Sequence, residues 1–139
     1  MKPIAKILAI ALVASVFSTA ALAKSAAENE ISTAIEHAEF SVNANNVATL
    51  HLHLHHVVNC LVGENGKQFY AKAGDPCKGM GNGAINDAHN AALKTRLEKI
   101  LHTAERGLEE KQLTRAHKTA SLVKRMLKRT MGQMSNKKR

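Results

Sequence analysis

Apolar residues recur every three or four positions in four segments of the chain, which is the spacing of one face of an α-helix. A stripe of this kind is typical of an amphipathic helix that buries its apolar face against neighbouring helices. The four stripes extend from Ala27 to Val42, from Val47 to Leu61, from Leu93 to Leu108 and from Leu113 to Met131. The pattern therefore predicts an all-α fold with four main helices.

Residues with strong capping preferences mark where these helices begin and end. Ser25 and Glu28 have the spacing of a capping box, in which a hydroxyl and a carboxylate each accept a hydrogen bond from the first helical turn. Gly63 ends the second stripe, since glycine tolerates the backbone conformation that terminates a helix. Asn86 and Asp87 are the two candidate caps of the third helix.

The lengths of the connections predict how the helices are arranged. Short joins near residues 43–46 and 107–110, where Gly107 interrupts the third stripe, make the flanking helices antiparallel neighbours. Residues 63–84 carry no apolar period and connect the two helical hairpins. We therefore expect an antiparallel four-helix bundle at residues 24–131 and a basic disordered tail at 132–139.

Composition narrows the class of protein. The chain has 139 residues, of which 45% are hydrophobic and only 3% are aromatic. This length allows one domain, the hydrophobic content excludes a wholly disordered chain, and the scarcity of aromatic residues disfavours a β-sandwich or barrel. No nucleophile–base pair and no paired carboxylates stand out by their spacing, so we do not expect an enzyme.

The first 23 residues have the organisation of a secretory signal peptide. Lys2 and Lys6 precede an apolar run, and Ala21 to Ala23 have the small-residue pattern that signal peptidase cleaves. The apolar run is shorter than the ~20 residues needed to cross a bilayer, and no later segment is more apolar. We expect an exported protein, periplasmic or secreted, that does not span a membrane.

An exported chain gives its two cysteines a structural role. Cys60 and Cys77 form an even pair, and disulfides persist in oxidising compartments. The sequence lacks the C-x-x-C motif of thioredoxin-like redox sites and the C-x-x-C-H motif of covalent haem attachment. We therefore predict a Cys60–Cys77 disulfide that staples the connection between the hairpins.

The histidines are the clearest candidate ligands. Five of the eight lie within twenty residues, and one run of six positions holds four of them. In a helix His51 lies about one turn from His55, as does His53 from His56, so each pair can present two imidazoles to one ion. His51 and His55 border the apolar stripe, and we expect His53 and His56 to point toward solvent. We predict metal binding by His51 and His55 first, with His53, His56 or His117 as further ligands.

Neutral imidazole suits copper, nickel and zinc. Glu39 or water is an alternative further ligand, while His37 falls on an outer helical face. Two other interpretations of the histidines stay open at this point. They could charge together below about pH 6.5 and act as a pH sensor, or facing histidine and methionine side chains could hold haem. Haem is disfavoured because the expected exported chain has only Phe40, Phe69 and Tyr70 for pocket walls.

A family resemblance supports the metal interpretation. The stretches Ala34-Ile35-Glu36-His37-Ala38-Glu39 and Ala116-His117-Lys118-Thr119-Ala120 are similar to those of small periplasmic metal-binding four-helix bundles of proteobacteria. The resemblance implies a monomeric bundle that takes up divalent ions on histidine-bearing helices. We predict that binding in this chain is reversible and serves buffering or protection. The chain departs from that family in its cysteine pair, its glycine-rich central loop and its few A-x-x-x-H units.

The charge is unevenly distributed and suggests an alternative function. Residues 24–92 carry four Lys/Arg and seven Asp/Glu, a net charge of −3, whereas residues 93–139 carry fourteen and four, a net charge of +10. The basic half predicts attraction to polyanions through Lys124, Arg125, Lys128 and Arg129. In an exported protein its partners would be anionic envelope lipids or an acidic protein, and the absence of aromatic residues from this half disfavours specific nucleic-acid binding.

Overall fold

The computed structural model describes residues 24–137, and within them the predicted all-α class is confirmed. The described residues form four α-helices and one short 3-10 helix, with no strand. The elements are α1 (Ala26–Val42), α2 (Val47–Val62), η1 (Ala71–Ala73), α3 (Ala91–Glu109) and α4 (Leu113–Lys137). The predicted signal peptide, residues 1–23, lies outside the described part.

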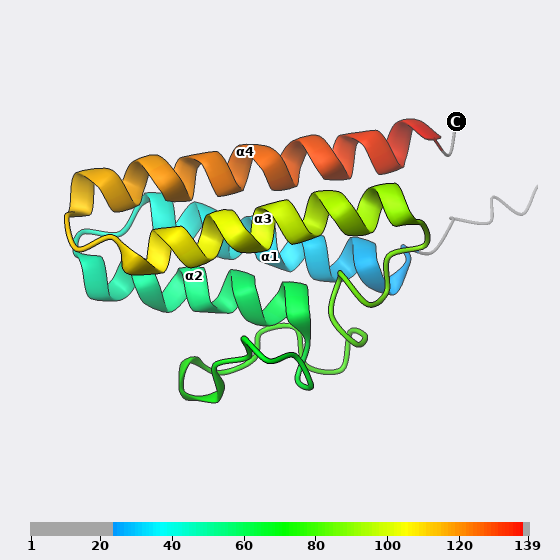
Figure 1. Ribbon diagram of the computed structural model, residues 1–139, viewed down its shortest axis with the longest axis horizontal. Coiled ribbons are helices and arrows are strands. Elements are labelled where there is room, and N and C mark those ends of the chain that lie inside the picture. The colour runs from blue at the N-terminus through cyan, green and yellow to red at the C-terminus, as the bar shows by residue number, and fades with distance from the viewer. Residues whose placement is uncertain (1–23, 138–139) are drawn as a thin grey trace, which may run out of the picture.

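The four helices lie side by side and surround a common core (Figure 1). Each helix packs against the next along the chain, and α1 also packs against α4, which closes the ring of neighbours. In Figure 1 the chain colour runs in opposite directions along α1 and α2, and again along α3 and α4. The apolar stripes meet inside this ring because burying all four at once removes the most apolar surface from water.

Glycine at position 107 serves close packing and does not end the third helix. The expectation that Gly107 interrupts the helix is wrong, because α3 continues to Glu109. Gly107 is buried, and a Cβ atom placed there would lie 2.7 Å from Cδ1 of Leu54. The missing side chain therefore lets α3 approach α2, and tertiary packing offsets the low helix propensity of glycine.

The predicted caps of α1 and α2 are confirmed, whereas that of α3 is wrong. Ser25 forms its capping box with Glu28, and Gly63 ends α2 with a φ of 72°. Helix α3 begins at the cap Asn90, whose side chain accepts a hydrogen bond of 2.8 Å from the amide of Leu93. The two residues predicted to cap it, Asn86 and Asp87, lie within the preceding loop. Their side chains bond to the backbone of Asn82, and Asn86 also donates to the carbonyl of Val62 at the end of α2.

The C-terminal segment differs from the disordered tail expected at residues 132–139. Helix α4 continues through Gly132 to Lys137, and residues 138–139 lie outside the described part. Met134 provides the reason, since its side chain is buried against the core and extends the apolar stripe by one turn. Lys137 and Ser25 line the same small hollow, so the two ends of the described chain are close together.

The connection between α2 and α3 is attached to the outer side of α2. The predicted disulfide is confirmed: Cys60 and Cys77 are bonded, with their Cα atoms 5.2 Å apart. The buried side chain of Asn59 makes three further bonds, accepting from the amide of Tyr70 at 2.9 Å and donating to the carbonyls of Tyr70 at 3.1 Å and Gly74 at 2.7 Å. These contacts hold η1 against α2 next to the histidine run.

Candidate metal centre

Three imidazoles from two helices converge on one point. Nδ1 of His37 lies 3.2 Å from Nδ1 of His53 and 3.0 Å from Nδ1 of His56. Each of the three residues has one ring nitrogen within 4.8 Å of those of the other two. Among residues 24–137 this is the only group of three or more potential metal-ligating side chains that meets this distance.

The packing of α1 on α2 brings these rings together. His53 and His56 are three residues apart on α2, so they project from the same face about one turn apart. His37 lies on α1, which packs against α2, and its ring centroid is 4.5 Å from that of His56. All three rings are half-buried, in contrast to the expectation that His53 and His56 point to solvent and that His37 occupies an outer face.

The carbonyl of Ala73, at the end of η1, determines which ring nitrogen of His56 carries the proton. Its Nε2 lies 2.6 Å from the carbonyl oxygen of Ala73, and a carbonyl can only accept, so Nε2 carries the proton and donates it. In the neutral ring Nδ1 then has a free lone pair directed at the other two histidines. Metal-binding histidines commonly donate their second ring N–H to a carbonyl in this way, which orients the ring and fixes its tautomer.

With three neutral rings, the single proton on Nδ1 of His37 has to be shared between two short contacts or leave one of them without a hydrogen bond. The 3.0 Å contact between His37 and His56 needs a proton on Nδ1 of His37 because Nδ1 of His56 is an acceptor. A protonated Nδ1 on His37 cannot also accept from His53, 3.2 Å away. A cation bound by the three nitrogens would satisfy all of them together, so the arrangement suits a metal ion better than a hydrogen-bonded cluster.

Burial and the proximity of neighbouring rings favour the neutral form of His37 and His53. Burial, followed by the proximity of His56 and then His53, lowers the pKa of His37 to about 4. Burial and the proximity of His56 also lower the pKa of His53. Because only the unprotonated imidazole binds a metal ion, these lowered pKa values leave the lone pairs available at neutral pH.

Two of the three nitrogen separations are close to those around a tetrahedral ion. Zinc–imidazole bonds of about 2.0–2.1 Å at tetrahedral angles place ligand nitrogens about 3.3 Å apart, close to the 3.0 and 3.2 Å separations observed. Phe40 flanks the group, with its ring centroid 5.5 Å from that of His37 and 5.2 Å from that of His53. Three histidines would leave the fourth position of a tetrahedral ion to water or another small ligand.

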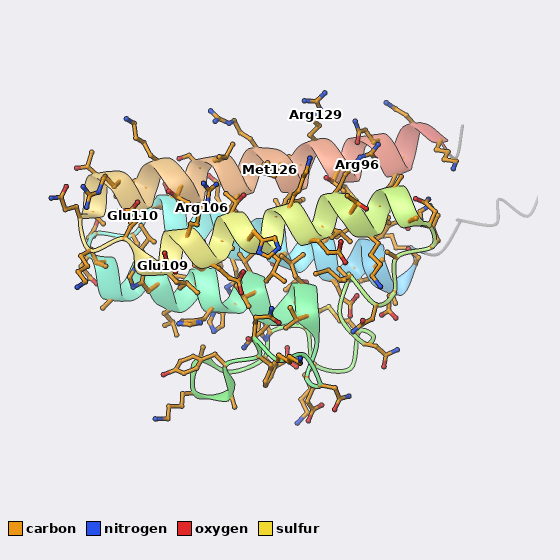
Figure 2. All side chains as sticks on the ribbon, in the orientation of Figure 1. Arg96, Arg106, Glu109, Glu110, Met126 and Arg129 are labelled. Atoms are coloured by element: carbon orange, nitrogen blue, oxygen red, sulfur yellow. A yellow bond between two sulfur atoms is a disulfide. The ribbon has the colours of Figure 1, made fainter. Side chains whose placement is uncertain are left out.

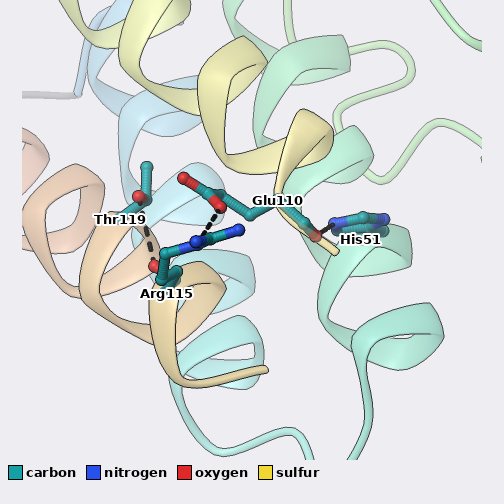
Figure 3. Close-up of polar contacts among 4 residues, drawn as sticks. All are labelled: His51, Glu110, Arg115 and Thr119. Atoms are coloured by element: carbon teal, nitrogen blue, oxygen red, sulfur yellow. Dashed lines mark hydrogen bonds and ion pairs between the residues drawn. The ribbon is translucent and has the colours of Figure 1, made fainter. Parts of the chain in front are cut away.

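The remaining predicted histidine ligands contact other parts of the protein. His51 donates from Nε2 to the carbonyl of Glu110, 3.0 Å away, at the join between α3 and α4 (Figure 3). His117 donates from Nε2 to the carbonyl of Ala44, 2.8 Å away. His55 stacks on Tyr70 with a centroid separation of 4.3 Å. The structure therefore brings His53 and His56 together with His37, and holds His51, His55 and His117 elsewhere.

Glu39, the predicted alternative ligand, connects α1 to α4. Its carboxylate lies 3.0 Å from Nζ of Lys124 and 3.6 Å from Nζ of Lys128, and these lysines lower the pKa of Glu39. The carboxylate is thus engaged with two cations rather than with the imidazoles. The same contacts partly neutralise two of the four residues predicted to bind polyanions.

Helical periodicity within one segment could not identify His37, but the register of the hairpin could have done so. His37 lies six residues before Asn43, where the join begins, and His53 lies seven residues after Asn46, where it ends. In an antiparallel hairpin such positions lie opposite each other. The similar distances of His37 and His53 from the join, counted along the sequence on either side of it, would have indicated this site.

Comparisons of the chain with protein-family models, curated proteins and solved structures find no match. In the span 24–137, no helix has both the length and the apolar character needed to cross a bilayer. The candidate site is therefore defined by its own geometry.

Proposed function

We propose that this protein binds one divalent transition-metal ion through His37, His53 and His56. The observation that carries the proposal is the convergence of three ring nitrogens within 4.8 Å of one another. The proton donated by His56 to Ala73 supports it, because that bond leaves Nδ1 of His56 unprotonated and oriented toward the group. The neutral state favoured by the lowered pKa values of His37 and His53 supports it further.

The donor set and its surroundings favour copper, nickel or zinc. Imidazole nitrogen is a good ligand for all three, whereas magnesium and calcium prefer oxygen. No carboxylate belongs to the described group of ligands, and one coordination position remains open. Such a site suits reversible uptake of the ion, for buffering or protection, without chemical turnover.

The proposed setting is an exported, antiparallel four-helix bundle of two hairpins with a stapled connection. Two features support it: the signal-like pattern of residues 1–23, and the Cys60–Cys77 disulfide, which is typical of proteins in oxidising compartments. In this setting the protein would act in the periplasm or outside the cell. The resemblance to small periplasmic metal-binding bundles is part of the same proposal.

Calorimetric titration with Zn²⁺, Cu²⁺ and Ni²⁺ tests the proposal. We expect one ion per chain in the wild-type protein and loss of measurable binding in the double variant His37→Ala/His56→Ala. The matched control is His89→Ala/His102→Ala, which removes two exposed histidines outside the group and should bind like the wild type.

The variant His51→Ala/His55→Ala separates this site from the one predicted by spacing within α2. We expect it to retain binding as long as circular dichroism shows a folded protein. Loss of binding in this variant, with retention in His37→Ala/His56→Ala, would contradict the proposed site. Absence of binding in the wild-type protein with all three metals would contradict the proposed function.

A further inference from the structure

A basic groove lies between α3 and α4, away from the imidazole group on α1 and α2. Its larger part is a hollow of about 360 Å³, lined mainly by Arg96, Lys99, Met126 and Arg129. A second hollow of about 290 Å³ adjoins it, because both are lined by Arg96 and Gln133. Figure 2 shows Arg96 on α3, with Met126 and Arg129 on the neighbouring α4. We call the two hollows together the α3–α4 groove.

Three cations of this groove, Arg96, Lys99 and Arg129, form no ion pair within the described part of the chain. No Asp or Glu lines either hollow. The ion pairs found among residues 24–137 involve Arg115, Lys124, Lys128 and His102, and none of them includes Arg96, Lys99 or Arg129. Lys137 adds a further cation in the second hollow. The groove is thus a better site for an anion than the lysines that contact Glu39.

Apolar side chains lie next to these cations. Met126 is partly exposed in the first hollow, and the buried side chains of Ile100, Leu93 and Met134 form the floor of the two hollows. A small hydrated anion gains nothing from such surfaces, whereas a molecule with a charged head and an apolar body can use both. Nucleic acid fits less well, because residues 93–139 contain no aromatic side chain on which bases could stack.

We propose that the α3–α4 groove binds the headgroup of an anionic phospholipid at a membrane surface. Arg96 and Arg129 contact the phosphate, since guanidinium groups form paired hydrogen bonds with phosphate oxygens. Met126, which is partly exposed, contacts the glycerol and upper acyl carbons. Binding here is peripheral and does not require metal at the imidazole group.

Flotation with lipid vesicles tests this proposal. We expect the wild-type protein to bind vesicles that contain phosphatidylglycerol and not vesicles of phosphatidylcholine alone. Arg96→Gln/Arg129→Gln should weaken the binding about tenfold or more, since each basic residue near the surface contributes roughly 1 kcal/mol. The control Arg106→Gln/Lys118→Gln removes the same charge from the same two helices outside the groove, and should weaken binding less than about threefold.

A second pair of variants avoids any doubt about folding. Gln133→Glu introduces a carboxylate on the exposed wall of the groove, and Gln112→Glu introduces one in the exposed join before α4. Only the first should weaken vesicle binding. Equal losses in the groove and control variants would overturn the proposal by showing that binding depends on overall charge alone.

Two further measurements identify the source of the anion. Inorganic phosphate alone should bind weakly and compete poorly with vesicles, and a DNA duplex should bind no more weakly to the groove variants than to the wild type. Saturable binding of inorganic phosphate that displaces the vesicles would overturn the lipid assignment. DNA binding lost in Arg96→Gln/Arg129→Gln and retained in the control would overturn it as well.

Discussion

His56 donates its Nε2 proton to the carbonyl oxygen of Ala73 across 2.6 Å, and this bond joins the candidate metal centre to the loop that follows α2. The loop is held by Asn59 and by the Cys60–Cys77 disulfide. The orientation of one proposed ligand therefore depends on residues that do not contact the ion.

Removal of the disulfide should weaken metal binding as well as stability. Cys60→Ala/Cys77→Ala frees residues 61–76 from their covalent closure, which we expect to lower the free energy of unfolding by about 3 kcal/mol. The carbonyl of Ala73 would then be held less firmly against His56, and loss of such a partner typically costs 10–100-fold in affinity, so we expect about tenfold. Urea unfolding and metal titration measure the two effects; unchanged affinity in a folded variant would show that the loop does not orient the site.

Replacement of Asn59 should release η1 from α2. Asn59→Ala removes three hydrogen bonds from a fully buried side chain, and leaves the amide of Tyr70 and the carbonyl of Gly74 without their partner. We expect a loss of about 2–3 kcal/mol in the free energy of unfolding. Hydrogen exchange should show faster exchange at the Tyr70 amide. Asn86→Ala, which removes exposed loop contacts, is the control and should not change exchange at that amide.

Glu30 should make stability depend on pH. Burial, opposed in part by the 2.8 Å hydrogen bond from the amide of Gly83, raises the pKa of Glu30 to about 7, with Asp87 and Asp75 also raising it. Between pH 4.5 and 7 the folded protein therefore holds a proton that the unfolded chain releases. Stability from this group is complete below pH 4.5 and is lost as pH rises to about 7.

The substitution Glu30→Gln isolates that contribution, because glutamine resembles the protonated acid and does not titrate. The difference in unfolding free energy between variant and wild type should grow by about 3 kcal/mol from pH 4.5 to 7, at 1.36 kcal/mol for each pKa unit. Denaturant unfolding at a series of pH values measures it. A difference that stays constant with pH would mean that Glu30 ionises normally in the folded protein.

Two glycines should respond to alanine in opposite ways. Gly132 lies within α4, and a Cβ atom added there has no neighbouring atom within 4 Å. Gly132→Ala should therefore stabilise the protein by about 0.5–1 kcal/mol, because alanine has the higher helix propensity. Gly63 has a φ of 72°, and its Cβ would collide with the backbone of Asn82, so Gly63→Ala should destabilise by more than 1 kcal/mol. Thermal unfolding measures both. No change in Gly132→Ala would indicate that residue 132 is not helical in solution.

Periodicity and capping chemistry predicted the four helices well, because each stripe has a single way to bury its apolar face. The join at 43–46 and the cap at Ser25 followed from local preferences alone. Local information failed where packing overrides it. Gly107 and Gly132 lie inside helices because Leu54 occupies the space beside one and Met134 extends the core beyond the other.

The sequence indicated a cluster of histidines but identified only some of its members. His53 and His56 were among the predicted ligands, whereas His51 and His55 ranked first because four-residue spacing places them on one helical face. Their partners, the carbonyl of Glu110 and the ring of Tyr70, come from distant segments. His37 lies in a different helix, so its contribution depends on the register between α1 and α2.

The shared hollow of Ser25 and Lys137 has a practical consequence. A short peptide could join these two ends without disturbing any helix, and the exposed residues 111–112 offer a place to open the chain instead. The bundle is therefore suited to circular permutation. A permuted chain that still binds metal would show that the site requires the packed helices but not their native order along the sequence.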